Sequence, residues 1–172
     1  MTISKPTSDE HLPYTADYID RVHGDWFAFQ DQTHLAFKAL VSPLSEAQAE
    51  MRPGPNEWNI KEIIGHIADG ERVFCYRALR VARKDTTPLP AFDQDTYVPA
   101  GEFTSRPLAD LLQELDTVRA ATVALFSTFS EEALLRRGTA SGATISVRAL
   151  AYIIAGHEHH HLESIKQVYL GK

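Results

Sequence analysis

The chain has 172 residues, 44% of them hydrophobic and 23% charged, which fits one globular domain with a buried core. A formal net charge of −6 without any basic run excludes an electrostatic footprint for nucleic acid. The single cysteine, Cys75, excludes an internal disulfide and CxxC metal or redox motifs, and no apolar run approaches the roughly 18 residues of a membrane span. No signal-peptide core is visible at the N-terminus, so we expect a cytoplasmic protein that binds a small molecule rather than nucleic acid or a membrane.

The N-terminal third predicts an arm followed by one long helix. Residues 1–13 are polar, contain two prolines and show no periodicity, so we expect a flexible arm ahead of a single domain over residues 14–172. From Tyr14 apolar side chains recur at helical spacing, and Pro43 ends this first helix.

A second helix is expected from about Ile60 to Arg83, after a loop rich in turn residues. Asn59 and Glu62 have the spacing of a capping box at its start. His66 lies on the apolar face of this helix, where a lone histidine is more often a core residue bonded to a carbonyl than a ligand.

Breaker residues interrupt helical patterning between Lys84 and Pro107. A connection of this length is uncommon unless it crosses the bundle or carries function. Its polar part includes Asp93 and Tyr97, which either line an active site or belong to a solvated loop.

Two more helices complete the pattern. One runs from Leu108 to about Phe129, and the last is capped by Ser146 after a polar turn. Four long helices without a convincing strand predict an all-α four-helix bundle whose long crossover joins the second and third helices. The broad apolar surface of the first and third helices favours a homodimer.

Histidines concentrate in the last helix, where four of the eight occupy residues 157–161. His157 and His161 fall in the gap of its apolar stripe, about 40° apart around the axis and one turn apart along it. Two imidazoles on the buried side of a helix suit a metal site, although a surface patch or hydrogen-bonded core histidines would give the same pattern. With His66, three imidazoles lie on apolar faces of two helices, and burying them without partners would be costly.

The segment Trp58–Asp69 resembles the second-helix signature of the DinB/YfiT-like superfamily of metal-dependent four-helix proteins, and Ser146–His161 resembles its C-terminal signature. The resemblance covers roughly residues 14–169. It implies up-down-down-up connections and a divalent ion held by three histidines, which carry over to His66, His157 and His161. His160 competes with His161 for the third position, and helical geometry favours His161.

The resemblance implies a metal-dependent hydrolase or a thiol-dependent S-transferase, because three imidazoles leave coordination positions open for water or substrate. Zn²⁺ and Ni²⁺ both suit imidazole ligands, and a low-molecular-weight thiol is an expected co-substrate for the transferase. Asp69, one turn after His66, is a candidate to orient a ligand ring. The alternative is a non-catalytic metal-binding stress-response protein whose bundle mainly dimerises. No nucleophile–base pair is visible, so the catalytic residues are not predicted.

Overall fold

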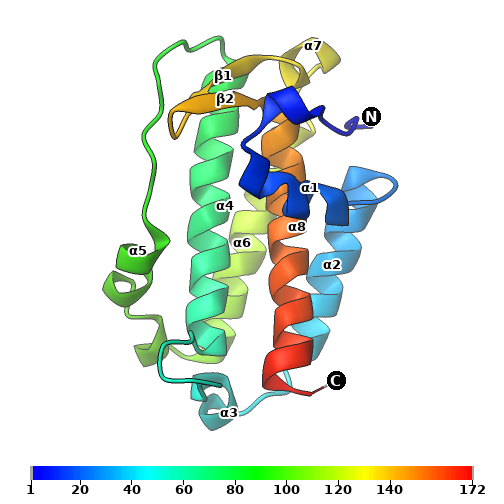
Figure 1. Ribbon diagram of the computed structural model, residues 1–172. Helices are drawn as coiled ribbons and strands as arrows, with labels where there is room; N and C mark the ends of the chain where they lie inside the picture. The colour runs from blue at the N-terminus through cyan, green and yellow to red at the C-terminus, as the bar shows by residue number, and fades with distance from the viewer. Residues whose placement is uncertain (1, 172) are drawn as a thin grey trace.

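Four long helices form the body of the protein in the computed structural model, which describes residues 2–171 (Figure 1). They are α2 (Trp26–Val41), α4 (Ile60–Ala82), α6 (Leu108–Phe126) and α8 (Val147–Ser164). Helices α4 and α6 run parallel, and α2 and α8 run in the opposite direction (Figure 1). This arrangement confirms the expected four-helix bundle with up-down-down-up topology.

Local capping fixes the starts of the two helices that carry the histidines. The side chain of Asn59 accepts a hydrogen bond from the amide of Glu62 at the start of α4, and that of Ser146 accepts one from the amide of Ala149 at the start of α8. Both starts match the sequence-based prediction.

The long crossover explains why α4 and α6 are parallel. It runs back along α4 through α5 (Gln94–Ala100) and the 3₁₀ turn Phe103–Ser105 before α6 begins (Figure 1). Shorter helices α3 (Glu46–Glu50) and α7 (Glu131–Leu134) lie at opposite ends of the bundle, a 3₁₀ turn spans Ser8–Glu10, and the π-helical turn Ile165–Tyr169 ends α8.

The expected first helix is wrong in one respect, because it is two helices. The turn Pro13–Thr15 leads into α1 (Ala16–Arg21), and a bend precedes α2. Gly24 has φ +73° in this bend, and the side chain of Asp25 caps α2 by accepting from the amide of Ala28. The break lets α1 pack against α8.

The expectation of no strand is also wrong. Strands β1 (Arg137–Ala140) and β2 (Ala143–Ser146) pair antiparallel in the register Arg137↔Ser146. The connecting Ser141 and Gly142 have φ of +53° and +78°, as a two-residue hairpin turn requires. The hairpin covers one end of α4 and α8 (Figure 1).

The N-terminal segment, expected to be a loose arm, is packed on the bundle. Ile3 is buried, and its carbonyl accepts a hydrogen bond of 3.0 Å from the hydroxyl of Tyr152. The buried carboxylate of Glu10 accepts from Nε of Arg148 at 2.8 Å. Because these partners lie on α8, far away in sequence, residues 2–13 show no periodicity of their own.

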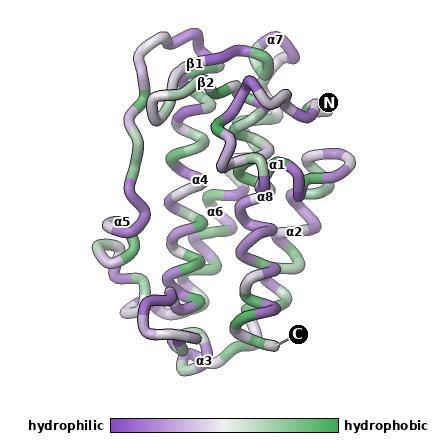
Figure 2. The backbone as a smooth tube through the Cα atoms, in the orientation of Figure 1, coloured by the Kyte–Doolittle hydropathy of each residue, from purple (hydrophilic) through white to green (hydrophobic). Residues whose placement is uncertain are grey.

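The core has two apolar parts with a polar layer between them. One part surrounds Trp26 and Phe126 and the other surrounds Phe37 and Leu115. Hydrophobic and hydrophilic residues alternate within each turn along α4, α6 and α8, as in helices with one buried and one exposed face (Figure 2). Buried polar residues from all four long helices fill the layer between them: His34, His66, Glu71, Arg119, Thr122, His157 and Glu158. Among residues 2–171 no helix combines the length and apolarity needed to cross a membrane.

Candidate metal centre

Three histidine side chains meet inside the bundle. His66 comes from α4, and His157 and His161 come from successive turns of α8. Nε2 of His157 lies 2.9 Å from Nε2 of His66 and 3.1 Å from Nε2 of His161. The three rings together offer ligand nitrogens that all lie within 4.8 Å of one another.

Glycines directly before two of these histidines allow close packing behind the rings. A Cβ at Gly156 would lie 1.8 Å from the carbonyl oxygen of Tyr18, so α1 approaches α8 at a point where only glycine fits. A Cβ at Gly65 would lie 2.3 Å from the ring of Phe103 in the crossover. The ring of Tyr18 then stands edge-on to His157, with 5.4 Å between the ring centroids.

The three imidazoles are neutral near neutral pH. Burial, together with His160, lowers the pKa of His66 to about 4. Burial and the neighbouring rings hold the pKa values of His157 and His161 well below the usual histidine range. A neutral imidazole has one unprotonated nitrogen, which is the form that coordinates a metal.

The contacts between the three histidines cannot satisfy the hydrogen-bonding capacity of all three rings. Each neutral ring carries a single N–H, so only some of the three converging Nε2 atoms can donate to another, and the remaining lone pairs face each other. A cation between them would accept all three lone pairs, and imidazole is a preferred ligand of divalent transition metals. The donor set therefore fits such an ion.

Two pockets reach this cluster from different sides. The larger, of about 450 Å³, is lined by His66 and His157 and by apolar side chains that include Phe74 and Phe92. The smaller, of about 320 Å³, is lined by His160 and His161. Asp95 in α5 lines both pockets. The crossover thus contributes to the walls on both sides of the histidines.

The other candidate residues have different positions. Asp93 lines the larger pocket, and His160 lines the smaller one. The ring of Tyr97 is partly exposed and lies 5.7 Å from the ring of Phe92. The carboxylate of Asp69 forms an ion pair with Arg72 at 3.1 Å and makes no hydrogen bond to a histidine within residues 2–171.

Sequence reasoning missed two wall residues of the larger pocket, Tyr18 and Arg77. Tyr18 belongs to α1, which is positioned by the bend before α2. Arg77 lies eleven residues after His66 on α4, and the same face of the helix would have indicated it, because eleven residues return to within about 20°.

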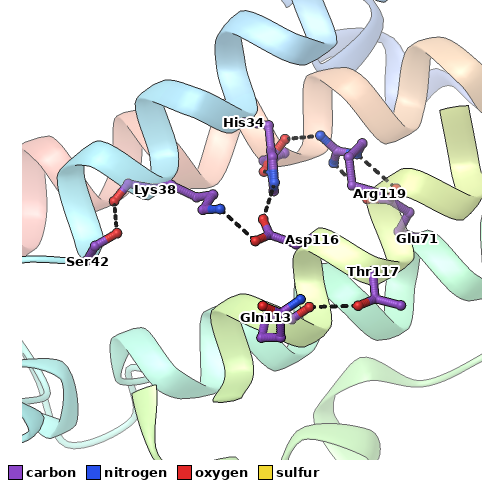
Figure 3. A network of polar contacts seen from close by, with 9 residues as sticks. His34, Lys38, Ser42, Glu71, Gln113, Asp116, Thr117 and Arg119 are labelled. Atoms are coloured by element: carbon purple, nitrogen blue, oxygen red, sulfur yellow. Dashed lines mark hydrogen bonds and ion pairs between the residues drawn. The ribbon is translucent and has the colours of Figure 1, made fainter. Parts of the chain in front are cut away.

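A second cluster, also missed, occupies the rest of the polar layer (Figure 3). His34 and Lys38 of α2 bind Asp116 of α6 at 2.8 and 2.6 Å. The other ring nitrogen of His34 lies 2.9 Å from Glu158, so both nitrogens face carboxylates. Arg119 is 2.7 Å from Glu158 and 2.7 Å from a carboxylate oxygen of Glu71. We refer to these residues as the charged cluster: His34, Lys38, Glu71, Asp116, Arg119 and Glu158.

The chain contains one cysteine, Cys75, and a lone thiol in a helix is more often a small core side chain than a nucleophile. Burial raises the pKa of its thiol to about 11, and Sγ lies 3.1 Å from the hydroxyl of Thr122. A thiol in this state supplies little thiolate at neutral pH.

Comparison with known proteins places the chain in a family. The sequence profile of the DinB superfamily matches residues 28–165. A protein of Oceanobacillus iheyensis, named "Putative metal-dependent hydrolase OB0413", is 29% identical over 128 residues, which cover 73% of each chain.

Solved structures share the fold. YfiT from Bacillus subtilis, described as "a probable metal-dependent hydrolase with an unusual four-helix bundle topology", superposes with a TM-score of 0.74 at 16% identity, covering 96% of this chain and 91% of YfiT. A mycothiol-dependent maleylpyruvate isomerase superposes with a TM-score of 0.67 at 14% identity, covering 80% of this chain and 58% of the isomerase. The profile match spans all four long helices, and the chain belongs to the DinB superfamily.

Proposed function

We propose that this protein is a metal-dependent hydrolase whose divalent ion is held by His66, His157 and His161. The observation that supports this most is the convergence of three neutral imidazoles beside a pocket of about 450 Å³. A purely structural ion is normally enclosed by four protein ligands, whereas three histidines leave room for a further ligand. The presence of the pocket favours an enzyme over the non-catalytic alternative.

The chain's own residues would bind and orient the substrate. Phe74 and Phe92 give one side of the pocket an apolar surface, and their ring centroids are 6.0 Å apart. When bound, the ion would supply Lewis acidity that polarises a carbonyl group or a water molecule. Asp93 and Asp95 are the carboxylates that line the pocket and are our candidates for accepting a proton from that water.

A thiol-dependent S-transferase is the second candidate, and the two-sided access to the histidines favours it. A transferase must bring a thiol and an electrophile to one centre. The smaller pocket reaches His161 while the larger one reaches His66 and His157, so two reactants can approach from different sides. The structural likeness to a mycothiol-dependent isomerase gives this reading a precedent within the fold.

The test begins with the metal content of the protein purified without an affinity tag, measured by mass spectrometry. We expect one equivalent of Zn²⁺ or Ni²⁺ per chain. Holo and chelator-treated protein are then assayed with aryl esters and amides, and separately with a low-molecular-weight thiol plus an electrophile. Turnover that chelation removes and metal restores supports the proposal, whereas a metal-free protein, or holo protein inert toward every substrate, contradicts it.

The assembly state is a separate proposal. Leu35 of α2 and Val123 of α6 are exposed on the helices from which we expect a homodimer. Sedimentation equilibrium at micromolar concentration should give twice the chain mass, and a pure monomer would contradict the dimer.

A further inference from the structure

The larger pocket contains a buried cation that the chemistry described above does not use. Arg77 is only 7% exposed, and its side chain lines the pocket together with His66 and His157. Nη2 donates to the carbonyl of Pro90 at 2.7 Å and to the hydroxyl of Ser141 at 3.1 Å. These two neutral acceptors fix the guanidinium without neutralising it.

No carboxylate within residues 2–171 forms an ion pair with Arg77, in contrast to the equally buried Arg119, which has two. The N–H groups of Nε and Nη1 likewise have no hydrogen-bond acceptor among those residues. Burial lowers the pKa of Arg77 for this reason, whereas for Arg119 the two glutamates outweigh burial and raise it. Neither Nε nor Nη1 is among the fully buried side-chain atoms without a partner, so the unpaired part of the guanidinium is accessible from the pocket, where it suits a ligand of opposite charge.

The surroundings of the guanidinium restrict that ligand further. Its Cζ lies 5.5 Å from the ring centroid of Phe92 and 6.0 Å from that of Phe74. A planar guanidinium beside aromatic rings suits a ligand in which a planar oxyanion is attached to an apolar group. Since Asp93 and Asp95 also line the pocket, and the guanidinium is a single positive charge, the surroundings favour one negative charge over two.

Arg77 is aligned with the histidines along α4. His66 and Arg77 project from the same face, roughly 16 Å apart along the helix axis. The ring of Phe74 lies between them and is 6.2 Å from the ring of His157. One elongated molecule can therefore contact Arg77 at one end and the histidines at the other.

We infer that Arg77 is a specificity-determining residue that binds the carboxylate of an elongated, apolar monocarboxylic substrate. This inference rests on the proposed function for the use of the site, because the reacting group of that substrate would lie at the histidine end. Binding of the carboxylate itself needs only Arg77 and the pocket walls, so it can be measured without metal.

The experiment titrates chelator-treated protein with phenylacetate and with its neutral analogue phenylacetamide, by isothermal calorimetry. We expect phenylacetate to bind at least tenfold more tightly than phenylacetamide, and Arg77→Met to remove this preference. Arg80→Met is the matched control on the next turn of α4, because the guanidinium of Arg80 pairs with Asp85 outside the pocket. The affinity of the Arg80→Met variant for phenylacetate should stay within twofold of that of the parent protein.

Equal affinity for the two probes, or an unchanged preference in Arg77→Met, would overturn the inference. Tighter binding of phenyl phosphate than of phenylacetate would overturn the inference that the pocket prefers a ligand with a single negative charge. If circular dichroism shows that the Arg77→Met variant does not fold, the Arg77→Lys variant is used in its place. Lysine keeps the charge but loses the planar fork, and should weaken phenylacetate binding at least threefold without abolishing the preference.

Metal content separates failure of this inference from failure of the proposed function. Parent protein without metal that still prefers phenylacetate supports Arg77 as the anion site and contradicts only the metal-dependent hydrolase. Parent protein with stoichiometric metal but no preference contradicts only the anion site. Arg77→Met should retain the metal content of the parent.

Discussion

His157 and Glu158 are neighbours on α8, yet they belong to two polar clusters of opposite character. Glu158 belongs to the charged cluster, in which the cations Lys38 and Arg119 and the ring of His34 face three carboxylates. His157 belongs to the histidine cluster, in which the Nε2 atoms of three neutral rings converge. Successive helical residues point about 100° apart, so one helix supplies both clusters.

The two clusters differ in whether opposite charges compensate the burial of their polar groups. Burial disfavours ionisation of Glu158, but Arg119 and His34 outweigh it and lower its pKa. Burial also acts on the histidine cluster, where no opposing charge compensates and the rings lose their protons instead. The charged cluster pairs each of its carboxylates within the protein, whereas the proposed role of the histidine cluster requires a bound metal ion.

The largest expected effect comes from opening the charged cluster. Arg119→Met leaves the buried carboxylate of Glu71 without its cationic partner and leaves Glu158 with His34 alone, so the free energy of unfolding should fall by about 3–5 kcal/mol. Urea denaturation measures it. Arg72→Met, which removes a half-exposed ion pair with Glu114, should cost less than about 1 kcal/mol. Equal losses in the two variants would contradict the comparison.

The second prediction removes a ring from the histidine cluster. His161→Ala removes a ligand and should lower metal affinity by roughly a hundredfold or more. This loss should exceed the loss caused by removing a residue that only hydrogen-bonds to a ligand. Metal content after gel filtration measures the effect. His159→Ala should keep the metal, and His160→Ala is the control for register. If His160→Ala loses the metal and His161→Ala retains it, His160 rather than His161 is the third ligand.

The third prediction concerns the packing that positions His157. Gly156→Ala places a methyl group against the backbone of Tyr18, so α1 must move, and the free energy of unfolding should fall by about 1–3 kcal/mol. Gly70→Ala is the matched control, because its Cβ would lie 3.5 Å from the ring of His157, an ordinary contact. Higher helix propensity should leave that variant as stable as the parent or up to about 1 kcal/mol more stable. Thermal unfolding compares the pair.

The smallest expected effect is the pH dependence of the charged cluster. Burial disfavours the charged form of His34, but Glu158 and Asp116 outweigh it, with Arg119 opposing them, and the pKa is raised. A raised pKa means that His34 contributes stability below its unfolded value of about 6.5 and that this contribution is lost as pH rises through the folded value. We expect a loss of about 1 kcal/mol or less above neutral pH, on the scale of one hydrogen bond. Urea denaturation from pH 6 to 9 should show the loss in the parent and not in His34→Gln.

Local rules in the sequence determined the helices that carry the histidines. The capping residues Asn59 and Ser146 fix the starts of α4 and α8, because a cap acts within one turn. The four-residue spacing of His157 and His161 puts both rings on one face of a helix of known pitch. The apolar face of the second helix also indicated His66, and the resemblance to the family added its role as a ligand and the up-down-down-up connections, which individual helix periods do not contain.

Only the tertiary structure decided which partners the buried polar side chains contact. The sequence around His34 indicates no partner, because its partners Asp116 and Glu158 lie 82 and 124 residues away. Helical spacing places Arg77 on the same face of α4 as His66, but the contacts that bury its guanidinium arise only when the crossover and the hairpin bring Pro90 and Ser141 to it. Whether a charge is buried, and whether it has a partner, depends on contacts between distant segments, and those contacts exist only in the folded bundle.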